Sequence, residues 1–314
     1  MNILVTGGAG YIGSHIVEQL LNERKKVIIV DNLSTGYKKL VNKNASFFLC
    51  DIKNYKKLNE IFKQNNISSV IHLAACLSVG ESQKKPKKYY SNNVLGTKNI
   101  VMCCKKNNIK NLIFSSTCAV YKDKMRTVKE NSIVNPKSVY GKTKLLGENF
   151  IKANLKTGKI NYAILRYFNV AGASESGKIG QISKGDQLFK NLSVAFLKTK
   201  PKVNIYGKDY STKDGTCIRD YIHVSDIAKI HVLIMKKINK INKSITLNCG
   251  YGKGISVLRV LKEFKKHAKS NIKIIFLGRR KGDMEKIIAN NKKLLKFIKW
   301  KPKYEKLKIL VKSS

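Results

Sequence analysis

The sequence predicts an α/β protein whose core is a doubly wound parallel sheet, followed by a smaller α/β region. Strand-like apolar runs alternate with helix-like stretches over the first 168 residues, a pattern typical of a parallel sheet with helices on both faces. A glycine-rich turn follows the first strand-like run, and shorter elements follow residue 168. We therefore expect one domain over 1–168 and a second over 169–314, with segments at about 220–249 returning to the first.

The spacing of apolar residues predicts each element in turn. In the first domain we expect strands at 2–7, 27–31, 45–50, 69–75, 111–116 and 160–168, and helices at 11–22, 54–66, 87–107 and 140–155. The Gly- and Ser-rich stretch 171–186 predicts a loop. Beyond it we expect helices at 188–198, 225–238 and 256–268, and strands at 203–206, 245–249 and 272–277.

The charge of the chain is strongly positive, with 63 Lys+Arg against 19 Asp+Glu and a formal net charge of +44. A basic balance can indicate a nucleic-acid or anionic-membrane binder. Here the lysines are spread along the chain, only seven basic residues are arginine, and no dense basic tail occurs. We therefore expect no nucleic-acid partner, although a positive field would attract an anionic substrate.

The cysteines and the hydropathy pattern indicate a cytoplasmic protein. Seven cysteines, an odd number, occur without a CxxC pair, which favours a reducing compartment and argues against a zinc site. No apolar stretch approaches the length of a membrane span. The first strand-like run begins at Asn2, which leaves no room for a signal peptide.

The stretch VTGGAGYIGSH (5–15) predicts a phosphate-binding loop. Glycines at 7, 10 and 13 lie between a strand and a helix, where a ligand's pyrophosphate can approach backbone amides at the helix N-terminus. Asp31 ends the second strand, where a carboxylate can accept hydrogen bonds from both ribose hydroxyls of NAD. Asp31 also begins the turn-like DNLSTG. Together these features indicate a Rossmann-type dinucleotide site.

Tyr140 and Lys144 are the candidate catalytic pair, four residues apart at the start of a predicted helix. A free tyrosine has a pKa of about 10 and is a poor base at neutral pH. Lowering it by about three units requires roughly 4 kcal/mol, part of which a neighbouring ammonium can supply. Thr117, at the carboxyl end of the fifth strand, could relay a hydrogen bond between a substrate hydroxyl and Tyr140.

The GxxGxxG spacing and the YxxxK pair resemble the extended short-chain dehydrogenase/reductase superfamily. More specifically, the chain resembles the UDP-glucose 4-epimerases, also called UDP-galactose 4-epimerases. The matching stretches cover about residues 1–304 in order: VTGGAGYIGSH, VDNLSTG, CDI, VGESQKKPKKYYSNNVLGT, FSSTCAVY, YGKTK, LRYFNVAGA, DGTCIRDYIHVSDIA and GRRKGD.

The resemblance implies a set of cofactor and substrate residues. NAD would contact Gly7, Gly10, Tyr11, Ile12, Gly13, Asp31, Asn32, Leu33, Ser34, Thr35, Gly36, Asp51, Ile52, Leu73, Ala74, Ala75, Leu77, Asn92, Tyr140, Lys144 and Phe168. The UDP-sugar would contact Thr117, Tyr167, Asn169, Leu188, Tyr206, Arg219, Arg280 and Asp283. The two arginines also fit a diphosphate on chemical grounds, since guanidinium forks bind phosphate oxygens bidentately, although each could instead make a surface ion pair.

The implied reaction is reversible inversion at C4 of a UDP-hexose through a transient 4-keto sugar, with Tyr140 as base, Lys144 as its partner and Thr117 as the relay. The resemblance also implies a homodimer formed through helices at about 88–107 and 140–155, and a sugar-pocket position at about Ile287. Ile287 is smaller than tyrosine and could admit an N-acetyl group.

Three alternatives remain open at this point. A nucleotide-sugar 4,6-dehydratase or UDP-glucuronate decarboxylase would be expected to carry an acidic residue just after Thr117, where this chain has Cys118 and Ala119. A catalytically impaired nucleotide-sugar-binding relic would keep the fold without turnover. A nucleic-acid binder would retain polyanions at high salt, whereas binding through charge alone should disappear.

Overall fold

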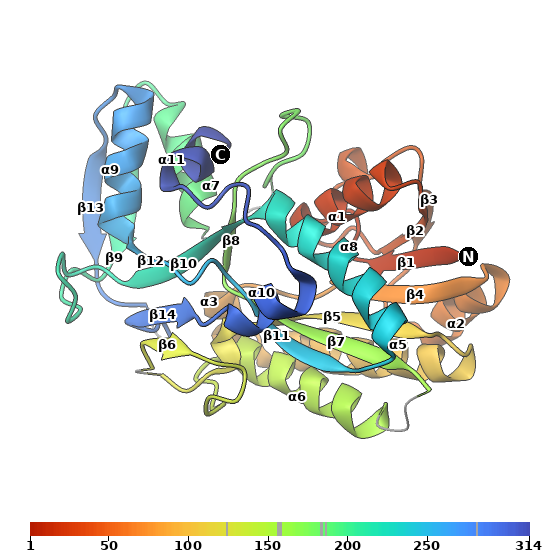
Figure 1. Cartoon of the computed structure of the whole chain (residues 1–314). Coiled ribbons are helices and arrows are strands. Elements are labelled where there is room, and N and C mark those ends of the chain that lie inside the picture. Colours follow the sequence, from red (N-terminus) through yellow and green to blue (C-terminus); the bar gives the residue numbers. More distant parts are fainter. Residues whose placement is uncertain (124, 156–158, 183–184, 186, 281) are drawn as a thin grey trace.

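The main layer of the protein is a parallel sheet of seven strands. The computed structural model describes the chain except for residues 124, 156–158, 183–184, 186 and 281. The strand order is β11-β7-β5-β4-β1-β2-β3 (Figure 1). These strands are β1 (Asn2–Thr6), β2 (Lys26–Asp31), β3 (Ser46–Leu49), β4 (Ile67–His72), β5 (Asn111–Thr117), β7 (Asn161–Tyr167) and β11 (Ile245–Cys249). The predicted doubly wound parallel sheet is confirmed.

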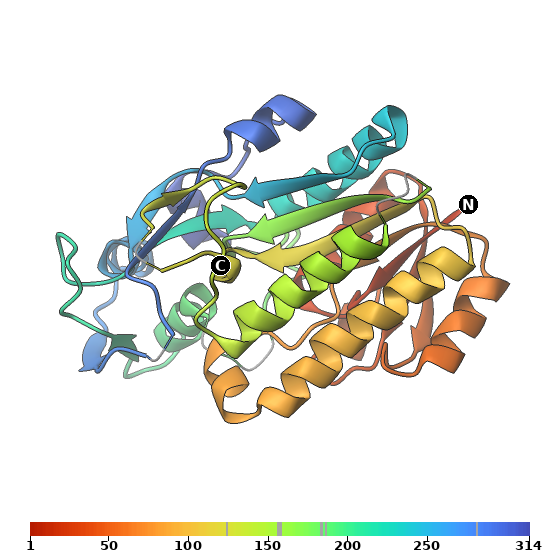
Figure 2. The same ribbon diagram turned by 90° about the horizontal axis from the view of Figure 1, so that it is seen from below.

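Helices cover both faces of this sheet (Figures 1 and 2). One face carries α1 (Tyr11–Asn22) and α8 (Val224–Ile241), and the other carries α2 (Tyr55–Gln64), α5 (Gly96–Lys106) and α6 (Val139–Asn154). Successive strand residues point to opposite faces. Ile3 and Val5 accordingly pack in the core shared with α1 and α8, while Leu4 packs in the core shared with α2, α5 and α6.

The order of the strands determines where a ligand can bind. From β1 the chain winds outward through β2 and β3, then returns to the other side of β1 with β4 and continues through β5 and β7. The carboxyl ends of β1 and β4 therefore lie at the point where the winding reverses. Ligands of doubly wound sheets bind in the crevice at that point.

The long helix predicted at 87–107 contains an irregular turn. It is divided into α4 (Pro86–Tyr89), a π-helical segment η2 (Tyr90–Leu95) and α5. Within η2, the Asn93 side chain accepts a hydrogen bond from the Cys76 amide at 2.8 Å and donates to the Cys76 carbonyl and the Thr143 hydroxyl, both at 3.1 Å. The π turn thus fastens the segment after β4 to helix α6.

The remainder of the chain forms smaller sheets beside the carboxyl ends of the main strands (Figure 1). One sheet has the order β12-β10-β14-β6, with β8 also paired to β10, and a separate pair joins β13 to β9. Their bounds are β6 (Thr127–Val128), β8 (Asn169–Ala171), β9 (Lys202–Tyr206), β10 (Ile218–His223), β12 (Gly254–Ser256), β13 (Lys273–Leu277) and β14 (Lys286–Ala289). The remaining helices are α3 (Val79–Lys84), α7 (Leu188–Phe196), α9 (Val257–Ala268), α10 (Lys292–Ile298), α11 (Leu307–Lys312) and the 3-10 turns η1 (Lys38–Leu40) and η3 (Cys118–Val120).

Two predictions for this region, a strand and a loop, can be compared with the structure. The strand predicted at 245–249 is β11, which joins the edge of the main sheet beside β7. In the loop predicted at 171–186, residues 183–184 and 186 lie outside the described residues. Among the described residues, none of the helices combines the length and the apolar character needed to cross a bilayer.

Candidate active site

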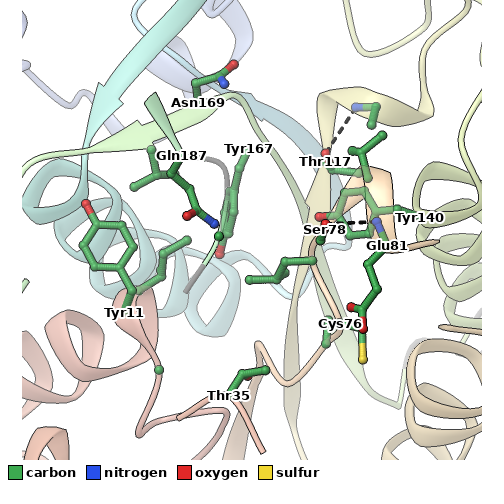
Figure 3. A pocket seen from close by; sticks show the side chains of 18 of the residues that line it. Tyr11, Thr35, Cys76, Ser78, Glu81, Thr117, Tyr140, Tyr167, Asn169 and Gln187 are labelled. Atoms are coloured by element: carbon green, nitrogen blue, oxygen red, sulfur yellow. Dashed lines mark hydrogen bonds between the residues drawn. The ribbon is translucent and has the colours of Figure 1, made fainter. Parts of the chain in front are cut away.

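A cavity of about 590 Å³ lies where the carboxyl ends of the main strands face the smaller sheets. This volume is in the range of cavities that bind small molecules. Figure 3 shows side chains from both parts of the chain around it, with Tyr11 and Gln187 on one side and Thr117 and Tyr140 on the other. Nearly all the predicted site residues line this one cavity.

The glycine loop closes one end of the cavity in a conformation that requires glycine. Gly7 has a φ of +72°, and a Cβ there would lie 2.8 Å from the Ala74 amide nitrogen. A Cβ at Gly13 would lie 2.1 Å from the Gly7 carbonyl oxygen. Helix α1 begins after Gly10 without a side-chain cap, so its first amides are open to a ligand. This is the geometry expected for a bound phosphate.

Asp31 joins the glycine loop to the loop after β2. Its carboxylate accepts hydrogen bonds from the Ala9 amide at 3.1 Å and the Leu33 amide at 2.8 Å. The second bond confirms that Asp31 also organises a turn. Burial raises the pKa of Asp31, and these two hydrogen bonds oppose the rise. Asn32, Ser34, Thr35 and Gly36 line the cavity beside it.

Two of the predicted cofactor residues do not line the cavity. Leu33 has a left-handed backbone with φ of 57° and lies outside the lining. Asp51 instead accepts a hydrogen bond from Asn32 at 3.1 Å and from the Lys53 amide at 2.8 Å. The other predicted cofactor residues in the middle of the cavity are in the lining: Ile52, Leu73, Ala74, Ala75, Leu77, Asn92 and Phe168.

Tyr140 and Thr117 meet at the centre of the cavity, as predicted. A hydrogen bond with the Thr117 side chain lowers the pKa of Tyr140, but burial outweighs it and raises that pKa to about 12. Thr117 is itself fixed by the Ala119 amide, which donates to its hydroxyl at 3.2 Å. With its pKa raised to about 12, Tyr140 holds its proton at neutral pH.

Lys144 lies on the same helix as Tyr140, one turn further along. Its Nζ atom is 3.5 Å from the Ser115 hydroxyl and 4.4 Å from the centre of the Phe114 ring. The side chain is 3% exposed, and burial lowers the pKa of Lys144 to about 7 while the charge of Glu148 opposes this.

The predicted substrate residues line the other end of the cavity. Arg280 Nε donates to the Asp283 carboxylate at 3.0 Å, and Arg219 Nη2 lies 3.9 Å from the same carboxylate. The Arg280 guanidinium lies over the Tyr206 ring, 4.6 Å from its centre. Two guanidinium groups thus converge on one carboxylate at this end. Tyr167, Asn169 and Leu188 also line the cavity.

Several cavity residues were not predicted from the sequence. Ser78, Glu81 and Lys88 line the cavity beside Tyr140, and Glu81 accepts a hydrogen bond from Lys88 at 2.8 Å. They follow the carboxyl end of β4, and that position could have identified them. Ser115 also lines the cavity and was not predicted to do so, although it lies in the matching stretch FSSTCAVY. Ile287, predicted as a sugar-pocket residue, is fully buried and in the lining.

The described residues contain no cluster of histidine, cysteine or acidic side chains suited to a metal ion. The seven cysteines are free thiols.

His72 lies between the hydroxyls of Thr6 and Thr97, at 2.7 and 3.0 Å, and burial lowers its pKa to about 3. A histidine so placed supports the strands and does not reach the cavity.

Comparisons with known proteins agree with this geometry. A family model described as "NAD dependent epimerase/dehydratase family" matches residues 3–250. The UDP-glucose 4-epimerase of Lactobacillus helveticus is 40% identical over 307 residues, which are 97% of this chain and 93% of that protein.

Solved structures give the same result. A UDP-glucose 4-epimerase from Stenotrophomonas maltophila with bound NAD and formylated UDP-arabinopyranose has a TM-score of 0.94 and 34% identity, over 100% of this chain and 96% of that chain. A UDP-glucose 4-epimerase from Bifidobacterium longum in complex with NAD+ and UDP has a TM-score of 0.92 and 35% identity, again over 100% and 96%.

Proposed function

The chain belongs to the NAD dependent epimerase/dehydratase family, and from this premise we propose that it interconverts UDP-galactose and UDP-glucose by NAD-dependent inversion at C4. One observation carries the proposal. A single cavity is lined by the glycine loop, by Tyr140 and Thr117, and by Arg219 and Arg280. A dinucleotide and a nucleotide sugar would then meet at the tyrosine.

The residues present fit NAD. The N-terminus of α1, which has no side-chain cap, would receive the pyrophosphate. Gly7 and Gly13 allow this tight loop, because a Cβ at either position would collide with neighbouring backbone atoms. Asp31 would accept hydrogen bonds from the adenosine ribose and would repel a 2′-phosphate. Lys144 would hold the nicotinamide ribose. When bound, NAD supplies the hydride acceptor and donor for C4.

Tyr140 would remove the proton of the 4-hydroxyl, with Thr117 as the relay between them. Because burial raises the pKa of Tyr140 to about 12, the phenolate needs positive charge from the ammonium of Lys144 and from the oxidised cofactor. Ionisation of Tyr140 would then depend on the oxidised cofactor as well as on Lys144.

The arginines would hold the diphosphate while the sugar turns. Arg280 donates to Asp283, and Arg219 Nη2 lies 3.9 Å from the same carboxylate, so a diphosphate bound there could accept hydrogen bonds from both guanidinium groups. A 4-keto sugar anchored only through its diphosphate can rotate and present its opposite face to the cofactor. Return of the hydride and of the Tyr140 proton then gives the inverted product.

Two other functions are less well supported. For a 4,6-dehydratase or a UDP-glucuronate decarboxylase, the positions after Thr117 carry no acid: Cys118 is a buried thiol with a pKa raised to about 12, and Ala119 cannot transfer a proton. A catalytically impaired protein that only binds nucleotide sugars would not need Tyr140, Thr117 and Lys144 to remain in place. The +44 charge comes from lysines spread along the sequence without a dense basic tail, which does not favour a nucleic-acid binder.

The decisive experiment supplies the purified protein with UDP-galactose and no added NAD. We expect UDP-glucose to form, because a cofactor regenerated in each turnover can stay bound. Tyr140→Phe should retain NAD and lose most activity. A purified protein that carries no nicotinamide and gains no turnover from added NAD would eliminate the epimerase proposal.

The range of sugars can be tested in the same assay. Ile287 lines the cavity, and its side chain is smaller than tyrosine, so turnover of UDP-N-acetylgalactosamine is expected alongside UDP-galactose. Ile287→Tyr should abolish the former and spare the latter. Absence of activity on the N-acetyl sugar in the unchanged protein would refute this part.

The proposal extends to assembly, domains and location. Helices α4 to α6 carry exposed apolar side chains at Tyr90, Leu95, Met102 and Leu146. These side chains support a homodimer formed through the helices, which light scattering of the protein and of Leu95→Lys would test.

Residues 1–168 would form the NAD domain with α8 and β11 added to it, and most of 169–314 would form the UDP-sugar domain. Free cysteines and the need for NAD favour the cytoplasm.

A further inference from the structure

Lys144 is placed where its own charge is unfavourable. Its ammonium lies 3.5 Å from the Ser115 hydroxyl and over the Phe114 ring, and neither group carries a negative charge. Burial lowers the pKa of Lys144 to about 7. A lysine that is to stabilise a phenolate must remain an ammonium, so the protein needs a compensating negative charge nearby.

Glu148 provides a negative charge one turn further along α6. Four residues separate it from Lys144, so the two side chains leave the same face of the helix. Glu148 is 0% exposed, and its charge raises the pKa of Lys144 against the effect of burial. Charges interact more strongly in such an interior than in water.

The carboxylate of Glu148 is held rigidly and kept ionised. Arg166 donates to it from Nε at 2.9 Å and from Nη2 at 2.7 Å, and the Ser116 hydroxyl donates at 2.5 Å. Burial opposes ionisation, but these partners hold the pKa of Glu148 below its usual value. Ser115 and Ser116 are neighbours on β5, so a single strand fixes both Lys144 and Glu148.

Other ionisable groups around Lys144 do not supply this charge. Tyr140, on the same helix, is protonated because burial raises its pKa. His72 on β4 is neutral, since burial and then the charge of Lys144 lower its pKa to about 3. Arg166 on β7 is positive and bound to Glu148, and the half-exposed Lys152 lies 3.4 Å from the same carboxylate.

We infer that Glu148 is a positioning residue for the reaction: its carboxylate, anchored by Arg166 and Ser116, balances the buried ammonium of Lys144 and thereby keeps Lys144 able to act on Tyr140. The inference rests on the proposed function, because it assigns Glu148 a role in that chemistry. It does not place Glu148 in contact with substrate or cofactor.

The test measures the protonation of Lys144 directly. Brief acylation of the folded protein with acetic anhydride at a series of pH values, read at the Lys144 peptide by mass spectrometry, gives the pH midpoint at which the amine becomes reactive. In Glu148→Gln the midpoint should fall by about one unit, a tenfold loss of ammonium relative to amine above it. The alkaline limb of UDP-galactose turnover should move to lower pH by the same amount.

Two further variants separate charge from structure. Lys152→Gln removes a partner of the same carboxylate at its exposed edge and should leave the Lys144 midpoint unchanged. Glu148→Gln combined with Arg166→Met removes both charges of the pair and leaves no buried charge without a partner. Glu148 shares a helix face with Lys144, whereas Arg166 lies beyond Glu148, so removal of the Glu148 charge should affect the Lys144 ammonium more than removal of the Arg166 charge. We therefore expect the midpoint of the double variant to lie between those of Glu148→Gln and the unchanged protein.

The outcomes that would overturn the inference are definite. A folded Glu148→Gln protein with an unmoved Lys144 midpoint and an unmoved pH profile contradicts it. Should Glu148→Gln fail to fold, a double variant whose midpoint equals that of the unchanged protein contradicts it equally, since the pair would then contribute nothing to Lys144. Because the midpoint needs no substrate, absence of turnover in the unchanged protein would count against the proposed epimerase and leave this measurement valid.

Discussion

Replacing Lys144 by methionine removes the charge next to Tyr140 while keeping a flexible side chain of similar length. Residues four apart on a helix have Cβ atoms about 6 Å apart. For an ammonium and a phenolate oxygen separated by a similar distance of about 6 Å, a unit charge acting through an effective dielectric constant of about 20 contributes about 2.8 kcal/mol. Since about 1.4 kcal/mol corresponds to tenfold, the phenolate of Tyr140 should become about 100-fold harder to form.

This magnitude predicts two separate observations for Lys144→Met. Near pH 6.5, where the buried ammonium is largely present at a pKa of about 7, kcat for UDP-galactose should fall about 100-fold. The acidic limb of the pH profile, which reports ionisation of Tyr140, should rise by about two units. Activity should therefore partly recover at alkaline pH, which simple misfolding would not produce.

The assay has to separate charge from cofactor binding, because Lys144 is also proposed to hold the nicotinamide ribose. Turnover is measured with saturating NAD from pH 6 to 10, together with the nicotinamide content of the purified protein. Lys142→Met, an exposed position on the same helix, serves as the matched control and should behave as the unchanged protein. A Lys144→Met protein within a few-fold of normal activity, with an unmoved acidic limb, would refute the reasoning.

Three other predictions concern the cofactor, the substrate and stability. Gly13→Ala should fold but purify without NAD, because its Cβ would lie 2.1 Å from the Gly7 carbonyl; nicotinamide absorbance measures this, and retained NAD would contradict it. Arg219→Lys should raise KM for UDP-galactose about 10-fold or more, since a bidentate charged hydrogen bond is lost; an unchanged KM would remove Arg219 from the diphosphate site. Burial lowers the pKa values of His72, His223 and His231 to about 3, 4 and 4. Because these histidines take up protons in the unfolded chain first, thermal unfolding should show stability falling as the pH drops from about 6.5 toward 4. A stability that does not change with pH over this range would contradict the burial of these histidines.

The parts of the fold that the sequence predicted are those specified by local patterns. Helix α1 has the predicted bounds Tyr11–Asn22, because a glycine turn and apolar spacing mark it without reference to the rest of the chain. Strands β6, β12 and β14 have only two to four residues and pair with partners distant in sequence. Their formation depends on tertiary contacts that no short window contains.

The residues of the site also divide into those that local patterns identify and those that depend on the assembled fold. Tyr140, Thr117 and Arg219 were identified by type and position and line the cavity as expected. The state of the catalytic pair was not predictable, because the pKa of Tyr140 depends on burial that only the assembled chain creates. Glu148 was overlooked for a related reason: its partner Arg166 comes from β7, and no spacing in the sequence joins the two.

The π-helical turn η2 (Tyr90–Leu95) has a consequence for how this helix can change by insertion or deletion. An α-helix advances 3.6 residues per turn, so one residue more or less rotates everything beyond it by about 100°. Within the turn, Asn92 lines the cavity and the Asn93 side chain is hydrogen-bonded to Cys76. Beyond the turn, Ile100 is fully buried in the core shared with the sheet. Deleting one residue here would restore regular hydrogen bonding yet turn either the cavity side chains or the core side chains away, so the irregular turn keeps two faces of one helix in phase.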